Sequence, residues 1–318
     1  MAAIQTKASS MTKCLSFVSI ALLLSATSFA QQPAWQPAPG NVTLNLWPHG
    51  APSAQPNSRP EVNTTSAKDR MVAGKSVIRL GNVSVPTLTL YAPKSNNTGA
   101  AIVVFPGGSY QILAIDLEGT EVCDWLNSVG VNCILVKYRV PNSGPYPKSS
   151  AALQDAQRAV GIVRSHAKEW QIDPARIGVL GFSAGAHLSA ALNTHFDQRL
   201  YDPVDEADKI SCRPDFAVIV YPGYLALSEQ NMAPNPEIHV TSQTPPSFIV
   251  QAEDDPVHVE NSTVYYIALK NANVPAELHL YAKGGHGYGL RRTELPVTAW
   301  PKLVETWLQT IRVVPTTR

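Results

Sequence analysis

The sequence predicts an α/β protein built on one mostly parallel, twisted sheet with helices on both faces. Short apolar runs alternate along the chain with longer segments whose apolar residues recur at helical spacing. Most of the short runs are continuously apolar, as strands buried on both faces of a parallel sheet require. This alternation favours right-handed crossovers within a single open sheet.

The expected elements follow in order along the chain. Strands are expected at residues 76–80, 87–91, 101–105, 133–138, 176–180, 215–221, 247–252 and 277–281. Helices are expected at 118–126, 150–170, 184–193, 259–271 and 297–313. In such a sheet, reactive residues lie in loops that follow the carboxyl ends of strands. Those loops are therefore the place to look for catalytic residues.

The first 30 residues have the pattern of a secretory signal peptide. Lys7 and Lys13 precede an apolar run over 14–24, and small residues end the segment at Ala30. A membrane-spanning helix needs roughly 20 apolar residues, so we expect cleavage, a secreted or periplasmic protein and no membrane anchor. Residues 31–70 are expected to form a proline-rich arm, packed or loose, ahead of a catalytic domain over 71–318.

Composition excludes two broad classes. With 44% hydrophobic and 15% charged residues, the chain can bury a core and is not intrinsically disordered. The 25 Lys and Arg balance 24 Asp and Glu without a basic cluster, so nucleic acid is not an expected partner. Cys123, Cys133 and Cys212 remain after residue 30 and allow one disulfide, but their spacing does not establish which. No pair has the spacing of a zinc site, and no metal is expected.

A candidate nucleophile lies between a strand and a helix. Gly181-Phe-Ser-Ala-Gly185 follows the strand at 176–180 and precedes the helix at 184–193. G-x-S-x-G in this context forms a nucleophile elbow, whose sharp turn requires the flanking glycines. The pattern indicates Ser183 as the nucleophile.

A serine nucleophile needs a base, and the base needs an orienting acid. His286 lies in the glycine-rich stretch 284–289 after the last strand, whereas His187 is expected to be a packing residue of the helix. The acid should follow the strand at 247–252, where residues 253–255 are all acidic and spacing does not choose among them. The resulting order of serine, acid and histidine is that of an α/β-hydrolase.

The tetrahedral intermediate of acyl transfer needs donors for its oxyanion. The strand at 101–105 ends in a Pro-Gly-Gly turn, and paired glycines allow main-chain N–H groups to approach a ligand closely. We expect the donors to be the N–H groups of Gly107, Gly108 and Ala184.

Five motifs together resemble the secreted α/β-hydrolase-fold serine esterases of the acetylxylan-esterase-like family. They are Phe105-Pro-Gly-Gly-Ser-Tyr110, Lys137-Tyr-Arg-Val-Pro141, Gly181-Phe-Ser-Ala-Gly-Ala-His187, Asp254-Asp-Pro-Val257 and Gly284-Gly-His-Gly-Tyr-Gly-Leu-Arg291. The resemblance covers about residues 70–312 and implies the α/β-hydrolase fold with a short cap. It also implies that the acid is the Asp before the proline, which is Asp255.

The predicted function is a secreted serine carboxylesterase that removes acetyl groups from xylan or related glycans without a cofactor. The partner is then a small-molecule or polysaccharide ester. The alternatives are a feruloyl or general short-chain carboxylesterase, a serine peptidase, or an inactive hydrolase fold used as a binding module. The cap segment 222–246 holds five prolines, which favours a shallow cleft over a deep acyl tunnel. Tyr110, Tyr224 and Trp47 are the aromatic residues expected to stack on sugar rings.

Overall fold

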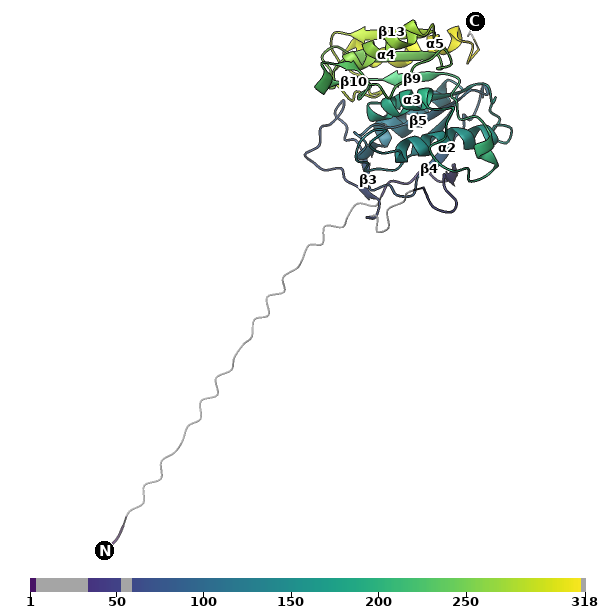
Figure 1. Cartoon of the computed structure of the whole chain (residues 1–318). Helices are drawn as coiled ribbons and strands as arrows, with labels where there is room; N and C mark the ends of the chain where they lie inside the picture. The colour runs from purple at the N-terminus through teal and green to yellow at the C-terminus, as the bar shows by residue number, and fades with distance from the viewer. Residues whose placement is uncertain (4–33, 53–58, 316–318) are drawn as a thin grey trace. The chain divides into compact units, whose positions relative to one another are not determined.

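The computed structural model describes residues 1–3, 34–52 and 59–315. The predicted signal peptide therefore lies outside the described residues except for its first three. From residue 34 onward, the described chain forms a central sheet with helices packed against it (Figure 1).

The central sheet has eight strands in the order β1-β4-β7-β5-β8-β9-β12-β13. In that order they are Val42–Asn45, Thr87–Tyr91, Asn132–Lys137, Ala101–Phe105, Ile177–Phe182, Ala217–Val220, Ser247–Ala252 and Ala276–Tyr281. β4 runs in the opposite direction to the other seven strands, and the pairs that do not involve it are parallel, so the mostly parallel sheet is confirmed. Every residue of β5, β7, β8, β9 and β12 is buried, which explains why apolar residues predominate in them.

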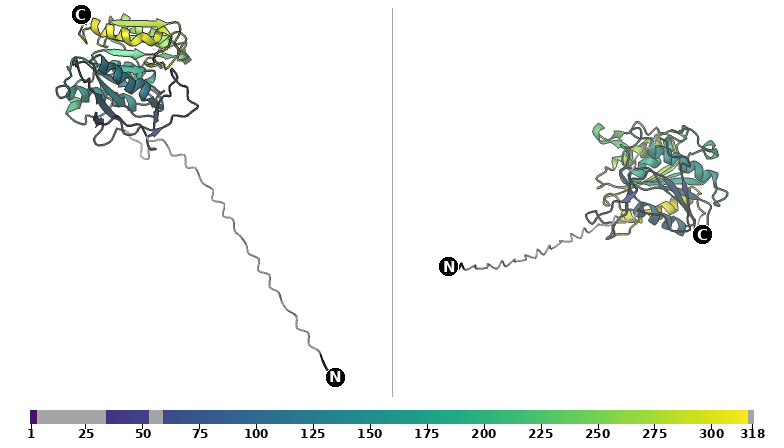
Figure 2. Two further views of the ribbon diagram at one scale, coloured as in Figure 1. Left: turned by 180° about the vertical axis from the view of Figure 1, so that it is seen from behind. Right: turned by 90° about the horizontal axis from the view of Figure 1, so that it is seen from below.

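Helices cover both faces of the sheet. On one face, α1 (Glu121–Ser128) and α5 (Trp300–Thr310) meet through Trp125 and Trp300, whose ring centroids are 5.5 Å apart. On the other face, α2 (Ala151–Ser165) packs against α3 (Ala184–Thr194). Figure 1 shows α2, α3 and α4 (Glu260–Asn271) in front of the sheet, whereas α5 comes forward when the molecule is seen from behind in Figure 2.

Two predicted elements differ from the observed ones. The strand expected at 76–80 is not part of the central sheet: β3 (Arg79–Gly81) pairs instead with β2 (Val62–Asn63) and β6 (Ile112–Ala114) in a small antiparallel sheet. The first three residues of the helix expected at 118–126 belong to a π-helical turn, η1 (Asp116–Thr120), and α1 begins only at Glu121. Periodicity alone could not distinguish these cases, because each segment is short.

The cap segment between β9 and β12 contains no α-helix. It carries the short strands β10 (Ala226–Leu227) and β11 (Ala233–Pro234), with a 3-10 turn, η3 (Ser228–Gln230), between them. The side-chain oxygen of Asn261 in α4 accepts hydrogen bonds from the N–H groups of Leu225 and Ala226 at 2.8 and 2.9 Å. The prolines thus leave a short cap held against α4. Two other 3-10 turns are η2 (Glu206–Lys209) and η4 (Pro296–Ala299).

The described part of the N-terminal arm is packed on the sheet and on α2. β1 pairs with β4, and the indole N–H of Trp47 donates to the buried carboxylate of Asp155 at 2.7 Å. Asp155 also pairs with Arg139 at 2.9 Å. The division of the chain at residue 70 remains a prediction.

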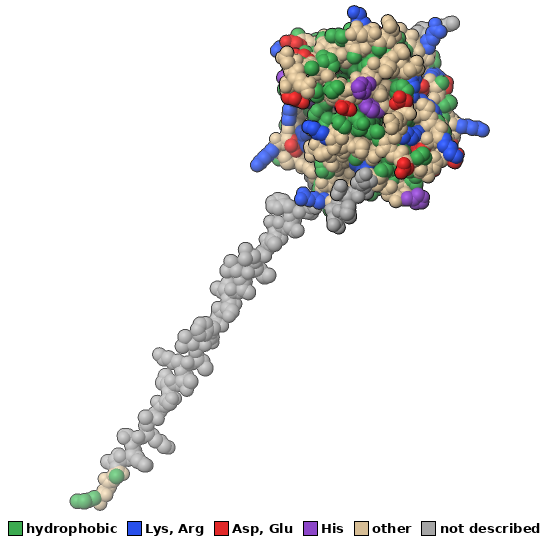
Figure 3. Space-filling view, viewed as in Figure 1, with side chains coloured by type: hydrophobic (Ala, Val, Ile, Leu, Met, Phe, Trp, Pro, Cys, Tyr) green, Lys and Arg blue, Asp and Glu red, His purple; other side chains and the backbone are tan. Residues whose placement is uncertain are grey.

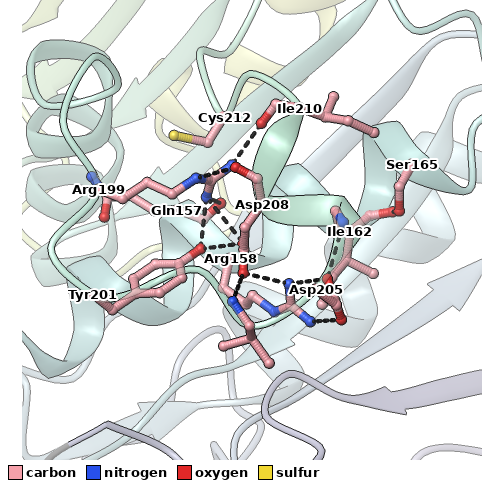
Figure 4. Close-up of polar contacts among 12 residues, drawn as sticks. Gln157, Arg158, Ile162, Ser165, Arg199, Tyr201, Asp205, Asp208, Ile210 and Cys212 are labelled. Carbon is pink, nitrogen blue, oxygen red and sulfur yellow. Dashed lines mark hydrogen bonds and ion pairs between the residues drawn. The ribbon is translucent and has the colours of Figure 1, made fainter.

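A second ionic cluster fixes the loop that follows α3. Arg158 on α2 pairs with Asp205 and Asp208, and Asp208 also accepts from the hydroxyl of Tyr201 at 2.7 Å (Figure 4). The Asp208 side chain has no exposed surface, so its charge is balanced by Arg158 and Arg199.

The cysteines resolve the pairing that the sequence left open. Cys123 in α1 and Cys133 in β7 form a disulfide, and Cys212 is a buried free thiol.

On the face seen in Figure 3, Lys and Arg side chains stand apart from one another rather than in one basic patch. Within the described residues, none of the helices has the length and hydropathy needed to cross a bilayer. The same residues contain no group of three or more His, Cys, Asp or Glu side chains placed to hold a metal ion.

Candidate active site

Ser183 occupies a strained turn between β8 and α3. Its φ and ψ are 52° and −117°, a conformation that costs about 1–3 kcal/mol for a residue with a side chain. A Cβ atom on Gly181 would lie 2.0 Å from the Gly185 oxygen, and one on Gly185 would lie 2.0 Å from the Phe105 oxygen. Both glycines are therefore required by the close approach of backbone, and the turn aims the serine hydroxyl outward from the strand end.

Three predicted residues from separate loops form a continuous chain of hydrogen bonds. Ser183 Oγ lies 2.8 Å from His286 Nε2, and His286 Nδ1 lies 2.8 Å from Asp255 Oδ2. The parallel strands β8, β12 and β13 end at the same edge of the sheet, which brings the three loops together.

The surroundings of Asp255 fix the orientation of the imidazole. The carboxylate has no exposed surface. It accepts from the Val257 N–H at 2.7 Å and from Gln251 Nε2 at 3.0 Å. Gln251 is held in turn by the Ser262 hydroxyl at 2.6 Å. Because Asp255 can only accept, His286 keeps its proton on Nδ1 and presents Nε2 as an acceptor to Ser183.

Asp254 binds different partners from Asp255. One of its oxygens accepts from the N–H groups of Gly284 and Gly285 at 2.9 and 2.8 Å. The hydrogen bond from Gly285 is the largest cause that lowers the pKa of Asp254. Asp254 thus holds the backbone of the histidine loop, whereas Asp255 holds the imidazole itself.

The loop after β5 carries the predicted oxyanion donors. The Gly107 N–H already donates to the carboxylate of Glu118 at 2.7 Å, so it is not available to an oxyanion here. Gly108 has a φ of 136°, and a Cβ there would lie 2.0 Å from the Ile112 oxygen. Among the described residues, neither the N–H of Gly108 nor that of Ala184 donates a hydrogen bond. These two groups remain as candidate donors, and Ala184 adds the positive end of α3.

A cavity of about 240 Å³ opens beside Ser183 and His286. Its apolar wall consists of Val72, Val77, Ile112, Ala114 and Leu117. Arg70 and Arg79 also line it, and Arg70 donates to the His286 carbonyl at 3.2 Å. Residues that precede β4 therefore form one side of the cavity.

The three aromatic residues expected to contact sugars lie in different surroundings. Tyr224 is 37% exposed, and its ring centroid is 5.9 Å from that of Tyr110. Tyr110 is only 2% exposed and shares a hydrogen bond of 2.8 Å with His187 Nδ1, so the prediction that its ring stacks on a sugar is wrong. The prediction for Trp47 is wrong, because Trp47 is 5% exposed and packs edge-on against Tyr201, bound to Asp155.

The expectation that His187 packs in the interior is confirmed. It is 1% exposed, and burial lowers its pKa to about 3.

The fold and the motifs both match those of known proteins. Residues 102–241 match the family described as the alpha/beta hydrolase fold. The crystal structure of an acetyl ester-xyloside bifunctional hydrolase from Caldicellulosiruptor lactoaceticus is 40% identical, with a TM-score of 0.64, over 73% of this chain and 90% of that one. The chain belongs to the α/β-hydrolase family.

Named esterases are found among the curated relatives of this α/β-hydrolase. An acetylxylan esterase from Xylanibacter ruminicola is 30% identical over 241 residues, which are 68% of this chain and 46% of the relative. An endo-1,4-beta-xylanase B from Butyrivibrio fibrisolvens is 29% identical over 66% of this chain and 36% of its own length. The chain thus spans less than half the length of either relative. The predicted resemblance to acetylxylan-esterase-like hydrolases is confirmed.

Sequence reasoning did not single out two residues of this hydrolase's site. Glu118 is 4% exposed, lines the cavity and accepts from the Tyr221 hydroxyl at 2.8 Å. Burial raises the pKa of Glu118, while the hydrogen bonds from Tyr221 and Gly107 act in the opposite direction. A glutamate near the start of a helix is common in any protein, so nothing in the sequence marked this one.

Proposed function

We propose that this protein is a secreted serine carboxylesterase that removes acetyl groups from xylan or a related glycan. Ser183 is its nucleophile, His286 its general base and Asp255 the orienting acid. The observation that carries this proposal is the chain of two 2.8 Å hydrogen bonds from Asp255 through His286 to Ser183, the last two of which line a cavity. No metal or organic cofactor is required by this chemistry.

The reaction follows from the positions of the three side chains. The Ser183 oxygen attacks the ester carbonyl while its proton moves to His286 Nε2. The resulting oxyanion is held by the N–H groups of Gly108 and Ala184. His286 then returns the proton to the leaving alcohol, and an acyl-serine remains. A water molecule, deprotonated by the same imidazole, releases the carboxylic acid and restores Ser183.

A small acyl group is favoured by the size of the cavity. Its volume of about 240 Å³ lies below the 300–1,000 Å³ typical of sites for drug-sized ligands. The cap contains no α-helix that could enclose a long acyl chain. The named activities of the acetylxylan esterase and the acetyl ester-xyloside hydrolase support the same substrate class. Secretion is proposed from the signal-peptide pattern of residues 1–30.

The first test replaces the nucleophile. We expect Ser183→Ala to lower kcat on 4-nitrophenyl acetate by at least about 10⁴-fold, because no other group can form the acyl intermediate. The matched control is Ser189→Ala, which removes a buried hydroxyl from the same helix. The control should keep activity within a few-fold. Retention of a tenth of wild-type activity by Ser183→Ala would contradict the mechanism.

The second test addresses the substrate. Hydrolysis rates are compared for 4-nitrophenyl esters of increasing chain length, acetylated xylan, feruloyl esters and peptide amides. We expect kcat/KM to fall beyond about four acyl carbons, because longer chains gain no burial at about 0.8 kcal/mol per CH₂. A maximum at octanoate or longer would refute the small-acyl proposal. If feruloyl esters or peptide amides are cleaved faster than acetylated xylan, they are the substrate class instead.

A further inference from the structure

We propose that Glu118 is a positioning residue of this site: its carboxylate couples the oxyanion loop to the histidine loop and supports the positive charge that forms on His286. The inference deepens the proposed esterase function and rests on it.

Glu118 is unlike the other carboxylates buried in the described chain. Asp155 pairs with Arg139 and Asp208 pairs with Arg158, so a guanidinium in contact balances each of these charges. The third, Asp255, contacts the imidazole of His286. Glu118 is also buried, yet no ion pair within 4.0 Å involves it in the described residues. Burial of an unpaired carboxylate costs several kcal/mol, so its position beside the nucleophile calls for a functional explanation.

The two oxygens of Glu118 hold two different loops. Oε2 accepts from the N–H of Gly107, and Oε1 accepts from the hydroxyl of Tyr221. Glu118 thus fixes the peptide group of Gly107, whereas the N–H of Gly108, which follows it, has no acceptor among the described residues and can donate to the substrate. The loop is also fixed by the Tyr138 hydroxyl, which donates to the Pro106 carbonyl at 2.6 Å.

Tyr221 carries the link onward to the base. Its hydroxyl oxygen accepts from the Gly289 N–H at 3.1 Å, which directs its own proton to Glu118. Its ring lies edge-on to the imidazole of His286, with 4.9 Å between centroids. Glu118 and Tyr221 therefore connect the loops after β5 and β13, which are distant in the sequence.

The hydrogen-bond directions fit an ionised Glu118, since both of its oxygens accept. The other titratable groups that face it are Tyr138, Tyr221, Arg79 and His286. Burial has the largest effect on the pKa of Glu118 and raises it, whereas the hydrogen bonds from Tyr221 and Gly107 and the positive charge of His286 act in the opposite direction. By Coulomb's law, an ionised Glu118 in turn attracts the positively charged form of His286. That form of His286 develops in the transition state, when the proton leaves Ser183.

The test is Glu118→Gln, which keeps the size and one acceptor but removes the charge. On 4-nitrophenyl acetate we expect kcat to fall about 10- to 100-fold, as for a misplaced oxyanion donor, with KM changed less than about threefold. We also expect the acidic limb of the kcat profile to move to lower pH, because the imidazole loses a negative neighbour. The matched control is Glu305→Gln, which changes a part-buried glutamate that binds the indole N–H of Trp125.

Each outcome decides the proposal. A fall in kcat with an unmoved acidic limb indicates a purely structural role and overturns it, as does a kcat within twofold of wild type. If Glu118→Gln does not fold by circular dichroism, Tyr221→Phe breaks the same link while keeping the carboxylate. That variant should also lose kcat at least about tenfold, and wild-type kcat in it would overturn the proposal.

Failure of the proposed esterase function is recognised separately. It would appear as a wild-type protein that cleaves none of the esters. In that case the rate at which a fluorophosphonate labels Ser183 is the readout for both variants, because labelling needs an activated serine but no particular ester.

Discussion

The roles of the two adjacent aspartates lead to opposite expectations for the same substitution. Three N–H donors converge on the Asp255 carboxylate, from His286, Gln251 and Val257. An asparagine there would turn one oxygen into an NH₂ group. If NH₂ replaces Oδ2, it opposes Gln251, and His286 must move its proton to Nε2, where it can no longer accept from Ser183. If NH₂ replaces Oδ1, it faces the Val257 N–H.

Either arrangement impairs the base, so Asp255→Asn should lower kcat by about 10³- to 10⁴-fold, or about 4–5 kcal/mol of transition-state stabilisation. Asp254 offers a single oxygen to Gly284 and Gly285, and its other oxygen lies 3.8 Å from the exposed Lys283. Asp254→Asn can keep the first oxygen and turn its NH₂ to solvent. We expect a loss of about tenfold or less in that variant.

The assay is the steady-state hydrolysis of 4-nitrophenyl acetate by both variants at one pH, after circular dichroism has shown that both are folded. Equal losses at the two positions, or a larger loss at Asp254, would refute the assignment of Asp255 as the orienting acid.

Three further outcomes are expected. Burial lowers the pKa of His187 to about 3, so below pH 6.5 the unfolded chain binds a proton that the folded chain does not. This difference removes about 2 kcal/mol from the free energy of unfolding by pH 5. Urea unfolding of His187→Asn should therefore show a smaller loss of stability between pH 8 and 5 than the wild type. Replacement of Cys123 and Cys133 by alanine opens a short loop and should lower the free energy of unfolding by about 2–3 kcal/mol in the same assay. Tyr224→Ala should raise KM for acetylated xylo-oligosaccharides more than KM for 4-nitrophenyl acetate, and equal changes would contradict a sugar-stacking role.

The sheet and the candidate site residues Ser183, Asp255 and His286 could be predicted from the sequence because both depend on local patterns. Buried parallel strands favour continuous apolar runs, which fill β5, β8 and β9 and the centres of β7 and β12. Ser183 and His286 lie in glycine-rich turns that directly follow strands. The choice between Asp254 and Asp255 came from the family resemblance, and the structure places these side chains on different partners.

Other features depend on tertiary contacts that no local pattern encodes. Trp47 looks like any surface aromatic residue until α2 brings Asp155 and Tyr201 against it. The segment at 79–81 has the composition of a strand but pairs outside the central sheet, because β2 and β6 offer it antiparallel partners. Glu118 acquires its position only when Gly107 and Tyr221 approach it from two other loops.

The loop that carries His286 also holds the segment that forms one wall of the cavity. Arg291, five residues after His286, donates to the carbonyls of Lys75 and Ser76 at 2.9 Å and pairs with Glu121 at 2.7 Å. These contacts hold the backbone of the segment that brings Val72 and Val77 to the cavity. Since this segment precedes β4, the shape of the cleft depends on a part of the chain that none of the five family motifs includes. We therefore expect substitutions at Val72 and Val77 to change the shape of the cleft without altering Ser183, Asp255 or His286.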